Sequence, residues 1–145
     1  IEWLRRLAAL LQLAERAVAI LAALLSLAVL LIIGNTIRLA VVNRQTEIEI
    51  IQLVGGTPGF VRRPFLYSGL LQGLLGGLLA WLLVEASLLL LSGPARELAG
   101  LYGSSFALTG LGADQGLSLA MAGAVLGWIG SRLAVGWQLR QIALR

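Results

Sequence analysis

The chain has 145 residues, of which 59% are hydrophobic and 12% charged, and its formal net charge is +4. Much of the surface of any small folded protein stays in contact with water, so a soluble domain could not hide this apolar content, and we expect a lipid environment. The absence of Cys and His excludes disulfides, thiolate or imidazole metal ligands, and Ser-His or Cys-His catalytic pairs.

Residues 1–16 predict an amphipathic helix. Trp3, Leu7 and Leu11 share one helical face, whereas Arg5 and Arg16 lie mostly elsewhere. Such a helix can rest on the membrane surface with its apolar side in the acyl boundary, or it can extend the following span into water. Because the first residue is Ile and not Met, we also expect the chain to be a fragment of a longer product.

Three charge-free stretches predict three membrane-spanning helices. Twenty-one uncharged residues separate Arg16 from Arg38, 21 separate Arg63 from Glu85, and 17 follow Asp114. Twenty-one helical residues measure about 31 Å, which matches the hydrocarbon core of a bilayer. We therefore predict an all-α polytopic membrane protein with spans at residues 17–43, 65–91 and 115–136 and a cytoplasmic tail at 137–145.

Residues 44–64 join the first two spans and predict a short helix, a break and a second short helix. Thr46 with two following acids is typical of a helix start, and Gly55-Gly56 is typical of a stop. Thr57 can cap a second helix that begins at Pro58, and Pro64 is expected to bend the chain into the next span. The first helix carries apolar residues that need a protein partner, or the inner ends of the spans, to cover them: Ile48, Ile50, Ile51, Leu53 and Val54.

The second and third spans carry small residues at four-residue spacing, namely Gly69, Gly73 and Gly77, then Gly123 and Gly127 followed by Ser131. This spacing forms a groove on one helix face, and such a groove lets another backbone approach closely. The partner helix can belong to the same chain or to a second subunit.

Glu85 is the one ionisable group inside a predicted span. An intramembrane acid costs about 2.5–3.5 kcal/mol on insertion scales, so it usually faces a partner or water. It can reach the outer interface, join a dimer seam or serve a proton path. The following residues 92–114 predict a short extracytoplasmic loop, with a short helix started by Gly93-Pro94 and a brief strand within 104–111.

The arginines predict the orientation. Seven lie on the side that carries the 44–64 segment and the C-terminus, among them the interface anchors Arg38, Arg44, Arg62 and Arg63, against four on the other side. Basic residues in short loops favour the cytoplasm, so we expect the 44–64 segment to be cytoplasmic. Because topology accounts for these arginines, the basic character does not indicate nucleic-acid binding.

The sequences "NTIRL", "EIE" followed by "LVGG", and "RRPFLY" resemble the FtsX family of cell-division permeases. Gly56 stands where Ala is usual in that family, and Pro58 stands where Asp is common. A motif like the "EIE" segment also occurs in lipoprotein-releasing and macrolide-exporting permeases, which are the alternative assignment, whereas "RRPFLY" does not.

The resemblance implies a non-catalytic membrane subunit of the bacterial inner membrane. It implies an FtsX homodimer that couples to the cytosolic ATPase FtsE, which would bind the ATP, so that no cofactor is expected in this chain. It also implies an extracytoplasmic activator of a cell-wall amidase, engaged through a domain absent from this chain, and contacts with other divisome proteins. The residues expected to couple to the ATPase are Glu47, Ile48, Glu49, Ile50, Ile51, Leu53, Val54, Gly55, Gly56 and Thr57.

Overall fold

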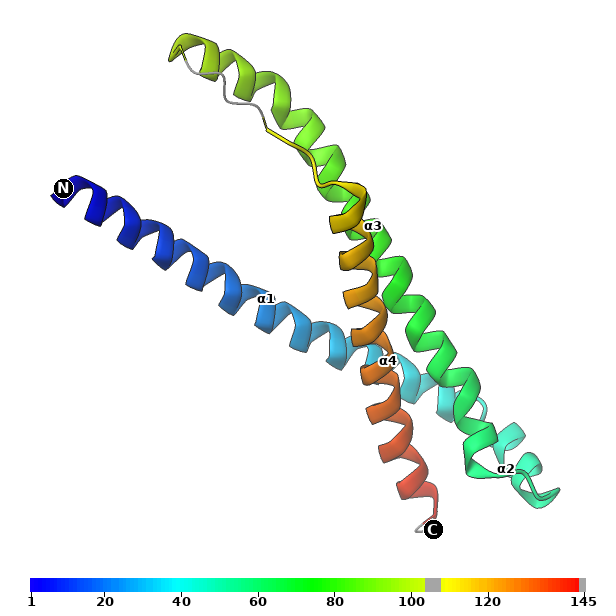
Figure 1. Cartoon of the computed structure of the whole chain (residues 1–145). Helices are drawn as coiled ribbons and strands as arrows, with labels where there is room; N and C mark the ends of the chain where they lie inside the picture. Colours follow the sequence, from blue (N-terminus) through cyan, green and yellow to red (C-terminus); the bar gives the residue numbers. More distant parts are fainter. Residues whose placement is uncertain (104–107, 144–145) are drawn as a thin grey trace.

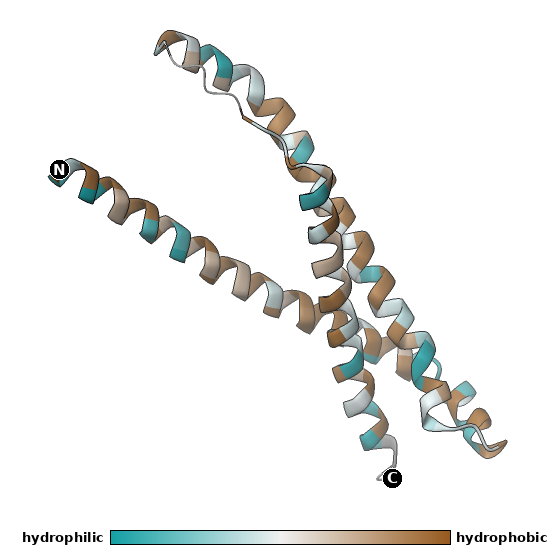
Figure 2. Ribbon diagram, in the orientation of Figure 1, coloured by the Kyte–Doolittle hydropathy of each residue, from teal (hydrophilic) through white to brown (hydrophobic). Residues whose placement is uncertain are grey.

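The computed structural model describes residues 1–103 and 108–143. In these residues the chain forms four helices and no strand: α1 (Glu2–Asn43), α2 (Gln45–Leu53), α3 (Pro58–Leu101) and α4 (Ala113–Ala143). Three of them, α1, α3 and α4, are long and apolar enough to cross a membrane, and hydrophobic residues cover most of their length (Figure 2). The predicted all-α polytopic fold is confirmed.

Helix α1 runs without a break through residues 16 and 17. Its 42 residues measure about 63 Å, roughly twice the hydrocarbon thickness. The amphipathic residues 2–16 therefore belong to the same helix as the first span. Their place on the membrane surface stays a prediction.

Helix α3 is also continuous, and this corrects the expectation of separate short helices beginning at Pro58 and at Gly93-Pro94. Pro64 and Pro94 both lie inside the helix, and the bend expected at Pro64 stays a prediction. A proline removes one backbone hydrogen bond, and the remaining bonds of so long a helix keep it intact on both sides. The helix continues to Leu101, so the segment that links it to α4 begins ten residues later than position 92. The strand expected within 104–111 falls partly on residues 104–107, outside the described residues.

Helices α3 and α4 lie side by side along most of α4 (Figure 1). Their contact is made of small residues. A Cβ added at Gly69 would lie 2.6 Å from the Ser131 hydroxyl, and one at Gly77 would lie 2.7 Å from the Cα of Ala120. A Cβ added at Gly73 would collide with the carbonyl oxygen of Gly123. The two backbones thus touch directly, which only glycine permits at these positions.

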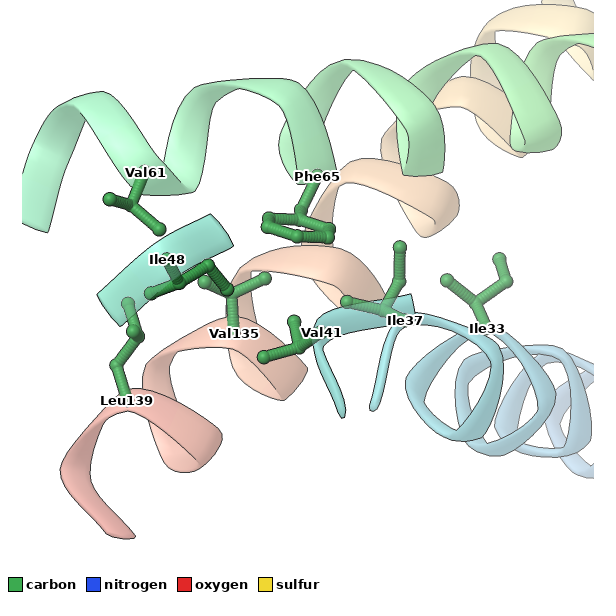
Figure 3. Packing of buried hydrophobic residues seen from close by; sticks show 8 residues of the cluster. All are labelled: Ile33, Ile37, Val41, Ile48, Val61, Phe65, Val135 and Leu139. Atoms are coloured by element: carbon green, nitrogen blue, oxygen red, sulfur yellow. The ribbon is translucent and has the colours of Figure 1, made fainter. Parts of the chain in front are cut away.

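The C-terminal part of α1 crosses α4, and the N-terminal part of α1 diverges from the other helices (Figure 1). At the crossing, a Cβ added at Gly130 would lie 3.2 Å from the Ile33 side chain. The buried apolar core lies where the four helices meet: Ile33, Ile37, Val41, Ile48, Val61, Phe65, Val135 and Leu139. We call these residues the end cluster (Figure 3). The core therefore occupies one end of the molecule.

The close contact of α3 and α4 makes a testable prediction. Gly73→Ala inserts a methyl group into the Gly123 backbone, and overpacking of this kind costs about 1–3 kcal/mol. Gly76→Ala is the matched control, because a Cβ there meets nothing within 4 Å and alanine favours the helix by up to about 1 kcal/mol. Unfolding in mixed micelles should show loss of stability for Gly73→Ala alone. Equal stability of the two variants would contradict the contact.

Candidate interaction site at the arginine-rich end

Helix α2 lies at the end of the molecule that also carries the C-terminal end of α1 and the start of α3 (Figure 1). We call this the arginine-rich end, after its exposed Arg38, Arg44, Arg62 and Arg63. Arg44 is the one residue between α1 and α2, and its carbonyl oxygen accepts a hydrogen bond from the Ile48 amide at 3.0 Å. So short a link ties α2 directly to α1.

The far end of α2 is closed by a glycine cap. The Gly56 amide donates to the Ile51 carbonyl at 2.8 Å, and the Gly55 amide donates to the Gln52 carbonyl at 3.1 Å. This is the Schellman pattern, in which the residue after the cap is left-handed; here Gly55 has a φ of +95°. A Cβ at Gly56 would lie 2.7 Å from the Ile51 carbonyl oxygen. The two glycines stop α2 and turn the chain toward Thr57 and Pro58, where α3 begins.

One face of α2 packs into the protein. Ile48 is 4% exposed and belongs to the end cluster, where it lies near Val61 and Leu139 (Figure 3). Ile51 is half-buried against the same cluster. The sequence left two possible covers for these isoleucines, a protein partner or the inner ends of the spans. The structure shows the second, because α1, α3 and α4 converge beneath α2.

The opposite face of α2 is open. Leu53 is 86% exposed, Val54 85% and Ile50 56%. Acidic side chains flank these apolar ones: Glu47 and Glu49 are exposed, and Glu49 accepts a long hydrogen bond of 3.4 Å from the Gln45 amide group. A continuous apolar strip with acids beside it can dock into a partner's groove. We call Ile50, Leu53 and Val54 the docking strip.

The sequence did not predict the end cluster, although the spacing of its residues was a possible signal for it. Its members recur at four-residue spacing on each long helix, as in Ile33 and Ile37, or Val135 and Leu139. In spans that are apolar all round, this spacing cannot be told from lipid-facing residues. Only the crossing of α1 over α4 selects which face is buried.

Glu85 lies toward the other end of α3 and is half-buried. A Cβ added at Gly110 would lie 2.7 Å from one of its carboxylate oxygens, so the acid faces the segment that leads into α4. Nearby, the Trp81 indole lies against Gly116 of α4, and its ring nitrogen is buried with no hydrogen-bond partner in the described residues. Roles for Glu85 in a dimer seam or a proton path stay predictions.

Nothing in the described part of the chain gathers acids for chemistry. No group of three His, Cys, Asp or Glu side chains there could hold a metal ion. The acids at Glu47 and Glu49 lie on α2, far along the chain from Glu85.

The glycine cap gives a prediction on the site itself. Gly55→Ala forces a residue with a Cβ into the left-handed region, which costs about 1–2 kcal/mol. We expect amide hydrogen exchange in residues 51–57 to speed up by about 5- to 30-fold. Gly59→Ala is the control, since its Cβ meets nothing within 4 Å and its φ is not positive. Identical exchange in both variants would show that the cap does not hold α2 in place.

The chain matches one protein family and several curated relatives. The FtsX-like permease C-terminal family matches residues 19–143. Cell division protein FtsX of Pseudomonas putida is 52% identical over 143 residues, covering 99% of this chain and 42% of the relative. That of Aeromonas hydrophila is 46% identical over 98% of this chain and 45% of the relative, and that of Haemophilus influenzae is 30% identical over 92% and 43%.

The chain spans less than half the length of these relatives. The resemblance drawn from the "NTIRL", "EIE" and "RRPFLY" sequences is confirmed by the match over nearly the whole chain. Together with three helices suited to cross a bilayer, these similarities place it in the bacterial inner membrane as a multi-pass protein. The chain belongs to the FtsX-like permease family, whose relatives here are permease-like membrane proteins of cell division.

Proposed function

We propose that this chain is the membrane subunit of an FtsEX-type ABC complex in bacterial cell division. It transmits ATP binding and hydrolysis by the cytosolic ATPase FtsE across the inner membrane, and this activates peptidoglycan hydrolases at the septum. The chain acts as a homodimer and is not itself an enzyme, and the ATP is bound by the partner. An extracytoplasmic domain engages the activator of the cell-wall amidase.

The observation that carries the proposal is the two-sided character of α2. Its docking strip is open, with Leu53 and Val54 each more than four-fifths exposed, while Ile48 on the other face is locked into the end cluster. An apolar strip outside the hydrocarbon core has no lipid to cover it. Burying each such side chain against a protein stabilises a complex by about 1.5–3 kcal/mol, so a groove on an ATPase is a suitable cover.

The same arrangement supports transmission. A force on α2 reaches α1 through the single residue Arg44, and it reaches α3 and α4 through the end cluster. Close-packed interiors pass displacement on because they have few voids to absorb it. Since α1 and α3 are each more than 40 residues long, or about 60 Å, movement at the arginine-rich end is carried beyond the opposite face of the bilayer.

The homodimer draws support from α1. Toward its N-terminus this helix diverges from the other helices (Figure 1), and large apolar side chains there are exposed, including Leu13, Val18, Ile20, Leu21, Leu24 and Leu25. A second copy, or spans outside this chain, could pack on this surface, and lipid covers whatever remains. The other proposed contacts, with further divisome proteins, rest on the resemblance to the FtsX family alone.

Leu53→Arg tests the proposed joint. It removes one apolar contact and places a charge in the interface, so we expect the affinity for the ATPase to fall at least about tenfold. Ile51 is unsuited to this test, because it packs against the end cluster and its replacement would disturb the fold. Capture of FtsE by membranes with equal amounts of variant protein, together with coupled ATP turnover, measures the effect.

Leu101→Arg is the matched control. Leu101 is 82% exposed, close to Leu53 in exposure, but it ends α3 at the opposite end of the molecule. The control should capture FtsE as the unaltered protein does. If Leu53→Arg membranes capture FtsE undiminished and hydrolyse ATP in a coupled manner, α2 is not the joint.

A further inference from the structure

A large cavity opens between α1 and α4 at the arginine-rich end, beside the crossing of the two helices. Its volume is about 760 Å³, within the range of about 300–1,000 Å³ typical of sites for small ligands. Its charged lining consists of arginines contributed by three different helices: Arg38 of α1, Arg62 of α3, and Arg132 and Arg140 of α4. The proposed coupling function uses none of this cavity.

The positive charge around the cavity is not neutralised within the described part of the chain. None of the chain's seven acids lines the cavity, and no described carboxylate pairs with these arginines. Arg132 is held in place by the Trp128 ring, whose centroid lies 5.0 Å from the guanidinium carbon. Arg62 and Arg132 also line a neighbouring cavity of about 310 Å³ together with Arg63. An anion that enters the cavity would therefore meet four arginine side chains and no competing carboxylate from the lining.

The cavity wall changes from apolar to charged along its length. On α1 it begins with Leu27, Leu30 and Leu31, passes Gly34 and Asn35, and ends at Arg38. These eleven helical steps measure about 16 Å. An occupant must therefore carry an apolar chain at one end and an anionic group at the other.

We propose that this cavity binds one anionic phospholipid, with its phosphate among the arginines and an acyl chain along the α1 leucines. Guanidinium groups bind phosphate oxygens in pairs of hydrogen bonds, and basic pockets between spanning helices suit anionic headgroups. A zwitterionic lipid fits less well, because its ammonium group would find no carboxylate in the cavity lining. The bound lipid fills the space between α1 and α4 and stabilises the crossing of these two helices beside the end cluster.

The first test removes charge. The intact protein is placed in bilayers of phosphatidylethanolamine with increasing phosphatidylglycerol. Native mass spectrometry then counts the lipid molecules that stay bound when the protein is released from the bilayer. Arg38→Gln with Arg140→Gln should weaken phosphatidylglycerol retention by about 25-fold, at about fivefold for each arginine. The control removes two arginines remote from the cavity, Arg5→Gln with Arg6→Gln, and should retain lipid as the unaltered protein does.

The second test fills the cavity and leaves every charge in place. Gly34→Leu adds a side chain where a Cβ meets nothing within 4 Å, so the helix tolerates the change while the acyl chain loses its space. Gly76→Leu makes the same substitution on α3, where the added Cβ also meets nothing within 4 Å. Retention should fall for Gly34→Leu alone.

Four results would overturn the proposal. If both double arginine variants lose the same amount of bound phosphatidylglycerol, the lipid is attracted to the protein surface in general and not bound in the cavity. Equal retention of phosphatidylethanolamine and phosphatidylglycerol would remove the role of the arginines. Unchanged retention in Gly34→Leu, or a protein segment cross-linked into the cavity of a lipid-free unaltered protein, would mean that a lipid does not occupy it.

Discussion

The backbones of α3 and α4 touch because glycine lines both sides of their contact. In a bilayer the surrounding lipid is as apolar as the helix surface, so packing supplies the drive for association that water would otherwise supply. Gly73 against Gly123 brings the two helices as close as backbones allow. Helix α1 packs across this pair of helices, and its crossing point determines which apolar residues are buried. The end cluster and the seat of α2 both depend on it.

The cluster of larger buried apolar side chains lies at one end of the molecule, whereas the rest of the α3–α4 contact buries small residues such as Ala120 and Ala124. At the arginine-rich end four helices share one apolar cluster, whereas toward its N-terminus α1 stands away from α3 and α4 (Figure 1). The apolar cluster connects the helices at the packed end, and at the other end the surface of α1 is open to other proteins or lipid. Helix α2 joins the packed end through Ile48 and presents Leu53 outward. A signal that arrives at α2 would therefore be passed on to all three spans together.

Local patterns in the sequence predicted much of this architecture. Charge-free stretches locate the spans, and the four-residue spacing of glycine and serine marks the faces of α3 and α4 that meet. Two features depend on structure far along the chain and could not be predicted. The Gly93-Pro94 pair usually indicates a break, yet α3 continues through it. The cover for Ile48 comes from Val61, Val135 and Leu139, and no local pattern places those residues beneath α2.

Chemical accessibility of α2 tests most directly the claim that it is packed on one face and docks on the other. Because the chain has no native cysteine, Ile48→Cys and Leu53→Cys can each be labelled with an impermeant maleimide in membranes that expose the arginine-rich end, with and without the ATPase. We expect Leu53→Cys to react fast and to be protected by the ATPase, and Ile48→Cys to react slowly in both states. Reactive Ile48→Cys, or Leu53→Cys labelling that ignores the ATPase, would contradict it.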